Sequence, residues 1–165
     1  MSMMMTRSLV ASPIGPILIE ASDLCVAAIS ILPGAAPTDV DGPRPGSIAA
    51  EAGRQLAAYF EDRRTRFDLP LMPAATARGE ALRAAIAAVP AGETLSYGAL
   101  ARIAGSAPRA IGQACARNRF PIVIPCHRVV GSGGAIGHYS GGRGIATKAW
   151  LLDHERRAAE RGELL

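Results

Sequence analysis

Aromatic residues are scarce in this 165-residue chain: Phe, Trp and Tyr make up only 4% of it, although 49% of all residues are hydrophobic. A core must therefore be built from Ala, Leu, Ile and Val. No apolar run approaches the roughly 20 residues that a membrane-spanning helix needs. The first residues also lack the basic start and apolar stretch of a signal peptide, so we expect a cytoplasmic protein. With 19% charged residues, the composition is typical of a globular chain and unlike a disordered one.

Cysteine is sparse as well. Cys25, Cys115 and Cys126 are an odd number without short spacing, which argues against a disulfide framework and against a Cys-rich zinc site. His138 and His154 have no partner at metal-ligand spacing. We therefore expect no catalytic metal.

Acidic residues are nearly absent from residues 81–152, where Glu93 stands against seven arginines and Lys148. This segment carries a net charge of +7, whereas residues 1–80 carry −2. An excess this one-sided predicts a surface for a polyanion such as nucleic acid. The alternative is that an arginine-rich, lysine-poor chain reflects codon bias, but such bias would not concentrate the charge in one half.

The N-terminal part has the pattern of a small sheet with one helix. Residues 6–11, 17–21 and 25–31 predict three strands of an antiparallel meander, because turn-forming residues separate them. A helix is predicted from the N-cap Ser47 to about residue 62, and a fourth strand over residues 67–71. Helical patterns dominate afterwards, so we expect a domain boundary near residue 75.

The C-terminal part predicts a run of helices. Thr76 is expected to cap the first of them and Ser96 the second, which ends before Gly105. Ser106 is expected to cap a third helix, with Pro108 in its first turn. The second and third helices resemble a helix-turn-helix, a DNA-binding motif, although many helical bundles contain such a pair. A last helix is expected over residues 145–160.

Residues 121–128, Pro-Ile-Val-Ile-Pro-Cys-His-Arg, carry the most reactive side chains. An apolar run between two prolines predicts a short buried strand or extended segment. It delivers Cys126, His127 and Arg128 to its end, just before a glycine-rich loop. Three reactive or charged side chains at the end of an apolar segment indicate a functional site. A buried cysteine followed by two polar surface residues is the alternative.

Several motifs, in this order and spacing, resemble the O6-alkylguanine-DNA alkyltransferases, also called methylated-DNA–protein-cysteine methyltransferases. They are Ser96-Tyr97, Arg-Ala-Ile-Gly at 109–112, Asn118, Pro-Ile-Val-Ile-Pro-Cys-His-Arg-Val-Val at 121–130, Tyr-Ser-Gly-Gly at 139–142 and Trp-Leu-Leu-Asp-His-Glu at 150–155. The resemblance covers roughly residues 93–155 and continues more weakly into the N-terminal part. It implies an α+β fold with a ribonuclease H-like mixed sheet domain over residues 1–75. A helical domain with a winged-helix-like helix-turn-helix then follows over residues 76–165.

The resemblance also implies a function, which is direct-reversal DNA repair. An alkyl group would pass irreversibly and stoichiometrically from O6-alkylguanine in double-stranded DNA to Cys126, without a cofactor. O4-alkylthymine is a further candidate substrate. The damaged base would be flipped out of the duplex, with the second helix of the helix-turn-helix in the minor groove. We expect a monomer with no membrane partner.

Two other functions compete with this one. A non-enzymatic damage sensor would resemble the family but lack the cysteine, and Cys126 is present. A Cys–His–Glu hydrolase would draw its cysteine and histidine from distant segments, whereas Cys126 and His127 are adjacent.

The resemblance assigns the reaction to three residues. Cys126 would be the nucleophile, His127 its base through a water molecule, and Glu155 the group that orients the imidazole. For Glu155 the alternative is an exposed carboxylate at a helix end. Arg128 would support the loop or contact a phosphate, and Cys115 would be a small buried hydrophobe.

Other residues would bind the base and the DNA. Tyr97 would donate a proton to the guanine ring, or else would only pack on the core; Asn118 would brace the loop that carries Cys126, or else would only end a helix. The residues expected to contact the base are Tyr97, Val129, Tyr139 and Ser140. Arg109 would fill the gap left by the flipped base, with a simple phosphate contact as the alternative. The other expected DNA contacts are Ser96, Ala110, Gln113, Arg117 and Arg119.

The chain departs from the family pattern in the helix before the helix-turn-helix. Arg78 and Arg83 stand there in place of the usual Phe and Trp. In addition, Arg119 follows Asn118 where a proline is common.

Overall fold

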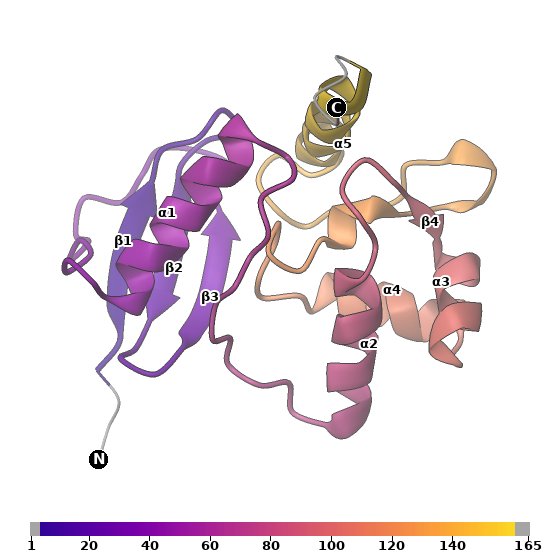
Figure 1. Ribbon diagram of the computed structural model, residues 1–165, viewed down its shortest axis with the longest axis horizontal. Coiled ribbons are helices and arrows are strands. Elements are labelled where there is room, and N and C mark those ends of the chain that lie inside the picture. The colour runs from indigo at the N-terminus through magenta and orange to yellow at the C-terminus, as the bar shows by residue number, and fades with distance from the viewer. Residues whose placement is uncertain (1–3, 161–165) are drawn as a thin grey trace.

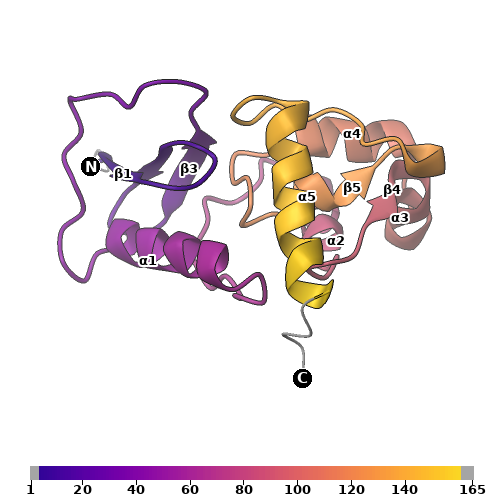
Figure 2. The ribbon, with the colours of Figure 1, turned by 90° about the horizontal axis from the view of Figure 1, so that it is seen from above.

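The computed structural model describes residues 4–160, and its N-terminal part is a three-stranded sheet covered by one helix. Strands β1 (Thr6–Val10), β2 (Ile17–Ala21) and β3 (Val26–Ile31) pair antiparallel in the order β1-β2-β3, as predicted. Helix α1 (Ile48–Glu61) lies across one face of this sheet (Figures 1 and 2). Ser47 caps it as expected, because its hydroxyl accepts a hydrogen bond from the amide of Ala50.

The remaining elements are mostly helical. They are α2 (Ala77–Ala87), β4 (Leu95–Ser96), α3 (Tyr97–Ala104), α4 (Pro108–Ala116), the 3-10 turn η1 (Cys126–Arg128), β5 (Val129–Val130), the 3-10 turn η2 (Ser132–Gly134) and α5 (Ile145–Glu160). Among residues 4–160, no helix is long and apolar enough to cross a membrane. The chain is thus of mixed α+β class.

The predicted helix caps are confirmed except for one. The hydroxyls of Thr76 and Ser96 accept hydrogen bonds at the starts of α2 and α3, and Gly105 ends α3 with a φ of +63°. Helix α4 instead starts after Ala107, without a side-chain cap. Ser106 does not cap α4, and its hydroxyl accepts a hydrogen bond from Nη2 of Arg78 at 3.1 Å.

Two predicted strands are wrong. Residues 67–71 form no strand, and only Leu71 makes an isolated parallel bridge to Val26. Residues 121–125 form turns, with Ile122 in the left-handed region at a φ of +74°. Apolar content predicted burial correctly there, since Ile122 is buried, but it could not predict the backbone conformation.

The outer edge of β3 joins the sheet to the rest of the molecule. The amide of Val26 donates to the carbonyl of Pro70 at 2.7 Å, and the amide of Ile29 donates to the carbonyl of Arg119 at 2.8 Å. The amide of Gly142 donates to the carbonyl of Ile31 at 2.9 Å. The buried apolar residues of both parts form one core cluster. The domain boundary near residue 75 therefore stays a prediction.

Candidate active site

Cys126 lies in the tight turn that follows the irregular segment 121–125. Its amide donates to the carbonyl of Ile124 at 2.8 Å across Pro125, whose φ of −80° and ψ of +63° are those of an inverse γ-turn. Asn118 holds this turn, because its Nδ2 donates to the carbonyl of Ile124 at 2.8 Å and to Sγ of Cys126 at 3.3 Å. The thiol is thus placed by backbone turns and one amide side chain.

The environment of Cys126 does not by itself produce a thiolate. Burial raises the pKa of its thiol, while the hydrogen bond from Asn118 and the nearby Lys148 ammonium only partly offset that effect. A thiol that stays protonated at rest is a weak nucleophile. A neighbouring base is therefore needed to take its proton.

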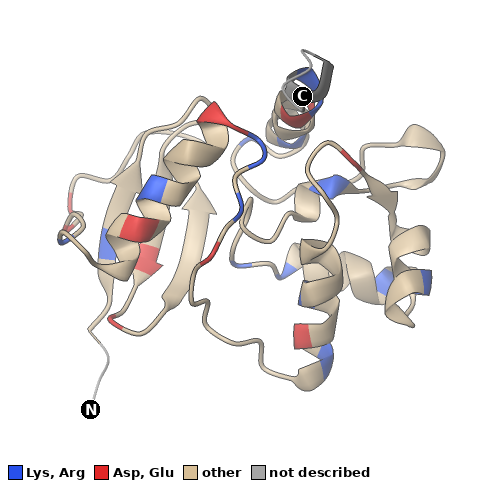
Figure 3. Cartoon of the chain, viewed as in Figure 1, with Lys and Arg blue, Asp and Glu red and all other residues tan. Residues whose placement is uncertain are grey.

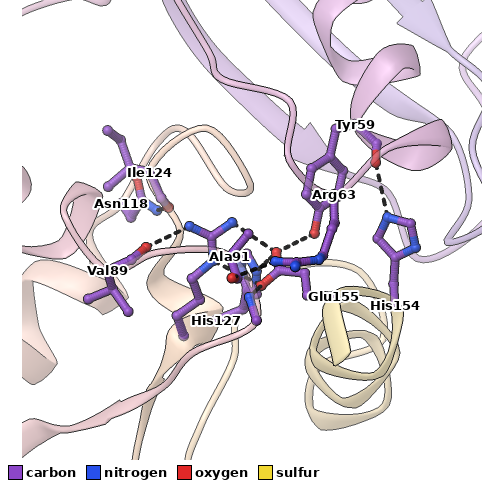
Figure 4. A network of polar contacts seen from close by, with 11 residues as sticks. Tyr59, Arg63, Val89, Ala91, Asn118, Ile124, His127, His154 and Glu155 are labelled. Carbon is purple, nitrogen blue, oxygen red and sulfur yellow. Dashed lines mark hydrogen bonds and ion pairs between the residues drawn. The ribbon is translucent and has the colours of Figure 1, made fainter. Parts of the chain in front are cut away.

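His127 is fully buried and hydrogen-bonded to Glu155, with 2.8 Å between Nε2 and Oε2 (Figure 4). Burial lowers the pKa of His127 below 6.5, and the contact with Glu155 opposes this only in part. The imidazole is consequently neutral at neutral pH. Because the Glu155 carboxylate accepts a hydrogen bond from Nε2, the other ring nitrogen, Nδ1, is unprotonated and available as a base. Nδ1 has no hydrogen-bond partner among the described residues.

Glu155 comes from α5 and is only 1% exposed, so the alternative of an exposed helix-end carboxylate is wrong. Arg128 donates to it twice, from Nε and Nη2, each at 2.9 Å. The hydroxyl of Tyr59 donates to Oε2 at 2.6 Å, and the amide of Gly92 donates to Oε1 at 3.4 Å. Burial alone would raise the pKa of Glu155, but His127 and Arg128 hold it well below its usual value. Glu155 therefore stays ionised, and Arg128 balances its charge.

A pocket of about 150 Å³ opens beside Cys126. Its lining residues are Tyr97, Gly112, Cys115, Ala116, Cys126, His138, Tyr139 and Ser140. The short strands β4 and β5 bring two distant segments together here, because they pair parallel with Leu95 opposite Val129. Tyr97 directly follows β4 and thus reaches the pocket. Burial raises the pKa of Tyr97, so its hydroxyl keeps its proton and can donate it.

Lys148 joins two segments next to this pocket from within the core. It is fully buried, and its Nζ donates to the carbonyls of Val129 at 2.7 Å and His138 at 3.1 Å. Its ammonium lies 6.0 Å from the centre of the Tyr97 ring. Lys148 is therefore a positive charge close to the thiol, held by backbone carbonyls.

The expected DNA contacts lie on the exposed side of α4. Arg109 and Gln113 are exposed one turn apart, Ala110 is half-buried between them, and Ile111 faces the core. Arg117 and Arg119 are exposed just beyond the helix. The hydroxyl of Ser96 caps α3, accepting a hydrogen bond from the amide of Ala99 at 3.0 Å. Helices α3 and α4 thus form a helix-turn-helix whose second helix is open on one face (Figure 1).

Known proteins resemble this chain over most of its length. A sequence model of the 6-O-methylguanine DNA methyltransferase DNA binding domain matches residues 79–157. The methylated-DNA–protein-cysteine methyltransferase of Methanosarcina barkeri is 37% identical over 155 residues, which cover 92% of this chain and 97% of that protein. The chain belongs to the methylated-DNA–protein-cysteine methyltransferase family.

Other family members agree with this assignment. The constitutive methylated-DNA–protein-cysteine methyltransferase of Bacillus subtilis is 43% identical over 109 residues, which cover 65% of this chain and 66% of that protein. The crystal structure of Mycobacterium tuberculosis OGT in complex with DNA matches with a TM-score of 0.76 and 34% identity. That match covers 92% of this chain and 93% of the OGT chain.

For this family member, the structure brings together most of the residues expected at the site. Cys126, Tyr97, Tyr139 and Ser140 line one pocket, and His127 contacts Glu155 behind it. Val129 is an exception, because its side chain is fully buried and it is not among the residues that line the pocket. Its carbonyl accepts a hydrogen bond from Nζ of Lys148, and its amide donates to the carbonyl of Cys126.

Two further residues of the site did not stand out as site residues in the sequence. Tyr59 comes from α1, nearly a hundred residues before Glu155, and no spacing rule links them. Lys148 counted only toward the basic charge, although it is the single lysine beside seventeen arginines. Being the only lysine was the one sequence feature that could have marked Lys148 as a site residue. Cys115 is also closer to the chemistry than expected, because it lines the same pocket as Cys126.

No metal site accompanies these residues. Among residues 4–160, no cluster of three or more His, Cys, Asp or Glu side chains is placed to hold a metal ion.

Proposed function

We propose that the chain repairs DNA by moving an alkyl group from O6-alkylguanine to Cys126, once per molecule. The observation that carries this proposal is the buried arrangement of Cys126, His127 and Glu155 beside a small pocket. Membership of the methylated-DNA–protein-cysteine methyltransferase family supports it. O4-alkylthymine is a second candidate substrate.

In the proposed mechanism, His127 accepts the thiol proton through a water molecule at Nδ1. Glu155 stabilises the imidazolium that forms, as the third member of a catalytic triad does. The thiolate then attacks the alkyl carbon, so that an S–C bond forms while the bond between that carbon and O6 breaks. The electron pair of the broken bond goes to the guanine, and Tyr97 donates a proton to the ring. The proton released from the thiol restores Tyr97 through His127 and solvent, and the products are guanine and a thioether.

The pocket residues would hold the base in position for this attack. Ser140 and the backbone around Tyr139 would donate to O6. Asn118 would keep the turn of Cys126 in place, which its two hydrogen bonds support. Arg128 would act only through Glu155, because its two hydrogen bonds to that carboxylate and its burial leave it no access to DNA.

The exposed face of α4 would lie in the minor groove of the duplex. Arg109, exposed near the start of α4, would fill the gap left by the flipped base. The helix-turn-helix would belong to a winged-helix-like domain over residues 76–165, and the sheet of residues 1–75 to a ribonuclease H-like domain. The protein would act on DNA as a monomer.

Intact-mass measurement after incubation with an O6-methylguanine oligonucleotide tests the proposal. We expect each chain to gain one methyl group, and Cys126→Ala to gain none. Binding without a mass gain would indicate a damage sensor, and repeated turnover would indicate a hydrolase; either result contradicts the proposal.

A further inference from the structure

A groove lies between α2 and α4, on the side of α4 that faces away from the Cys126 pocket. It has a volume of about 600 Å³, and residues 72–76, α2, α4 and the segment after α4 line it. None of the lining residues belongs to the pocket beside Cys126. The groove is therefore a second, separate concave surface.

Four arginines line this groove: Arg78, Arg83, Arg117 and Arg119. Figure 3 shows positive segments on α2, on α4 and on the chain that follows α4, with one acidic segment on α2. That acidic residue, Glu80, already accepts hydrogen bonds from Arg83 at 3.3 Å and from the amide of Ala74. The groove therefore keeps an excess of positive charge.

Arg83 lines the groove, but its guanidinium is already engaged in contacts within the protein. Its guanidinium lies 5.2 Å from the centre of the Phe120 ring, and its Nη1 donates to the carbonyl of Met72 at 3.0 Å. A cation stacked on a buried ring replaces, at this position, the aromatic residue expected from the family pattern. The substitution thus keeps the wall packed while adding a charge.

Arg78, Arg117 and Arg119 are the free charges. All three are exposed, and none forms an ion pair among residues 4–157, whose side chains the structure describes. Arg78 is steered toward α4 by its hydrogen bond to Ser106 in the turn of the helix-turn-helix. Cations gathered on a concave surface without acidic partners indicate an anionic ligand.

The groove also shares residues with the DNA-facing side of α4. Ala110 and Gln113, which we expect to contact DNA, form one of its walls. A duplex seated on α4 would therefore have a phosphate strand beside the groove. An acidic protein surface would suit the charge equally, but nothing in the fold would align it with α4.

We propose that this groove binds the sugar-phosphate backbone of the repaired DNA, and that Arg78 of α2 is a phosphate contact. The inference rests on the proposed function, since it takes DNA as the partner. It extends the DNA interface from the helix-turn-helix to α2.

The test measures affinity for an undamaged duplex as a function of salt, by fluorescence anisotropy. It needs no alkyl transfer, so it can fail independently of the proposed function. We compare the wild type with Arg78→Gln, with the charge-preserving Arg78→Lys, and with Arg44→Gln. Arg44 is an exposed arginine on the loop between β3 and α1, on the far side of the sheet from α2 and α4 (Figures 1 and 2).

If Arg78 binds a phosphate, Arg78→Gln should reduce the slope of log affinity against log salt by about one. Binding should weaken to the same extent for two unrelated sequences, because a phosphate contact carries no base information. Arg78→Lys should restore most of the slope, and Arg44→Gln should leave it unchanged.

Two results would overturn the proposal. One is a slope for Arg78→Gln equal to that of Arg44→Gln. The other is unchanged DNA binding together with weaker self-association in sedimentation, which would identify the groove as a contact between copies of the chain. Circular dichroism and melting temperature confirm that each variant is folded, and the exposure of Arg78 makes folding defects unexpected.

Discussion

Charged side chains behind Cys126 are buried and paired, whereas those just beyond α4 are exposed and, within the part of the chain that the structure describes, unpaired. Behind the thiol, the carboxylate of Glu155 is buried and accepts hydrogen bonds from Tyr59, His127, Arg128 and the backbone. Just beyond α4, Arg117 and Arg119 are exposed and form no ion pair with the other described residues. The charges behind the thiol are therefore paired within the protein, whereas the arginines beyond α4 are free to interact with a partner.

This difference separates the chemistry from the recognition. A buried ion without its partner is strongly destabilising, so residues behind the thiol affect folding and rate together. An exposed arginine contributes little to stability, so we expect residues on the exposed face of α4 to affect the binding and repair of duplex DNA without affecting folding. Variants in the two regions should therefore fail in distinguishable ways.

The largest effect is expected for Glu155→Gln. Without the carboxylate, Arg128 becomes an unpaired buried charge, which should lower the free energy of unfolding by about 3 kcal/mol or more. The imidazolium of His127 would also lack its stabilising anion, and alkyl transfer should slow by about 10²-fold or more. Chemical denaturation and single-turnover rates measure the two effects.

Asp153→Asn is the matched control on the same helix. Asp153 forms an exposed ion pair with Arg157 at 2.8 Å, worth about 0.3–0.5 kcal/mol. If Glu155→Gln behaved like Asp153→Asn, the contrast between the two regions would disappear.

The next effect is expected on the outer face, for Arg109→Ala. Unstacking a base costs a few kcal/mol, and an inserted side chain offsets part of that. We expect a rate on duplex DNA reduced by roughly tenfold, since about 1.4 kcal/mol corresponds to a factor of ten. The rate with free O6-benzylguanine should not change. Arg102→Ala, an exposed arginine on α3, is the control; an equal reduction on both substrates would refute the role of Arg109.

The substitution Tyr59→Phe, which removes one hydrogen bond to Glu155 and keeps the ring, should change stability and pH dependence more than the rate at neutral pH. The free energy of unfolding should fall by about 1.5–3 kcal/mol, as for a hydrogen bond to a charged group. The carboxylate would then hold the His127 proton more strongly, so the pKa of His127 should rise. The neutral imidazole is the active form, so the alkyl-transfer rate should fall in acid when His127 becomes protonated. We expect this fall below pH 6.5 in the wild type and at a higher pH in Tyr59→Phe.

A pH profile of the alkyl-transfer rate decides this point. A variant that is less stable but keeps the wild-type profile would show that Tyr59 only supports the fold.

The smallest effect is expected in the pocket between the two regions, for Cys115→Ala. Burial raises the pKa of the Cys115 thiol to about 12, so it stays protonated and unreactive. We expect the variant to take up one methyl group at a rate close to that of the wild type. Peptide mapping after reaction measures it; a methyl group found on Cys115 of the wild type would contradict the prediction.

The sequence predicted the parts of the fold that depend on local signals. Short segments between turn-forming residues predicted β1, β2 and β3, and the caps Ser47, Thr76 and Ser96 marked helix starts correctly. It failed at residues 67–71, whose apolar side chains are half-buried, and at residues 121–125, most of which are buried; neither segment forms a strand. Tertiary contacts decide the backbone there, and the left-handed conformation of Ile122 has no local signal.

Prediction of the site also succeeded only where the signal was local. Cys126 and His127 are adjacent and belong to a specific motif, and Glu155 ends another, so they could be named from the chain alone. Tyr59 and Lys148 reach the site only through the packing of α1 and α5, which no spacing in the sequence encodes. Arg78 and Arg83 were visible as departures, but only the structure shows that both line the groove between α2 and α4.

Lys148 makes the region next to the pocket chemically observable. Because it is the only lysine among the 165 residues and is fully buried, an amine-directed reagent can modify its side chain only after that region opens. The rate of its acylation, followed by peptide mapping, therefore reports the free energy of local opening next to the pocket. A bound duplex that closes the pocket should slow this labelling, without any substitution in the chain.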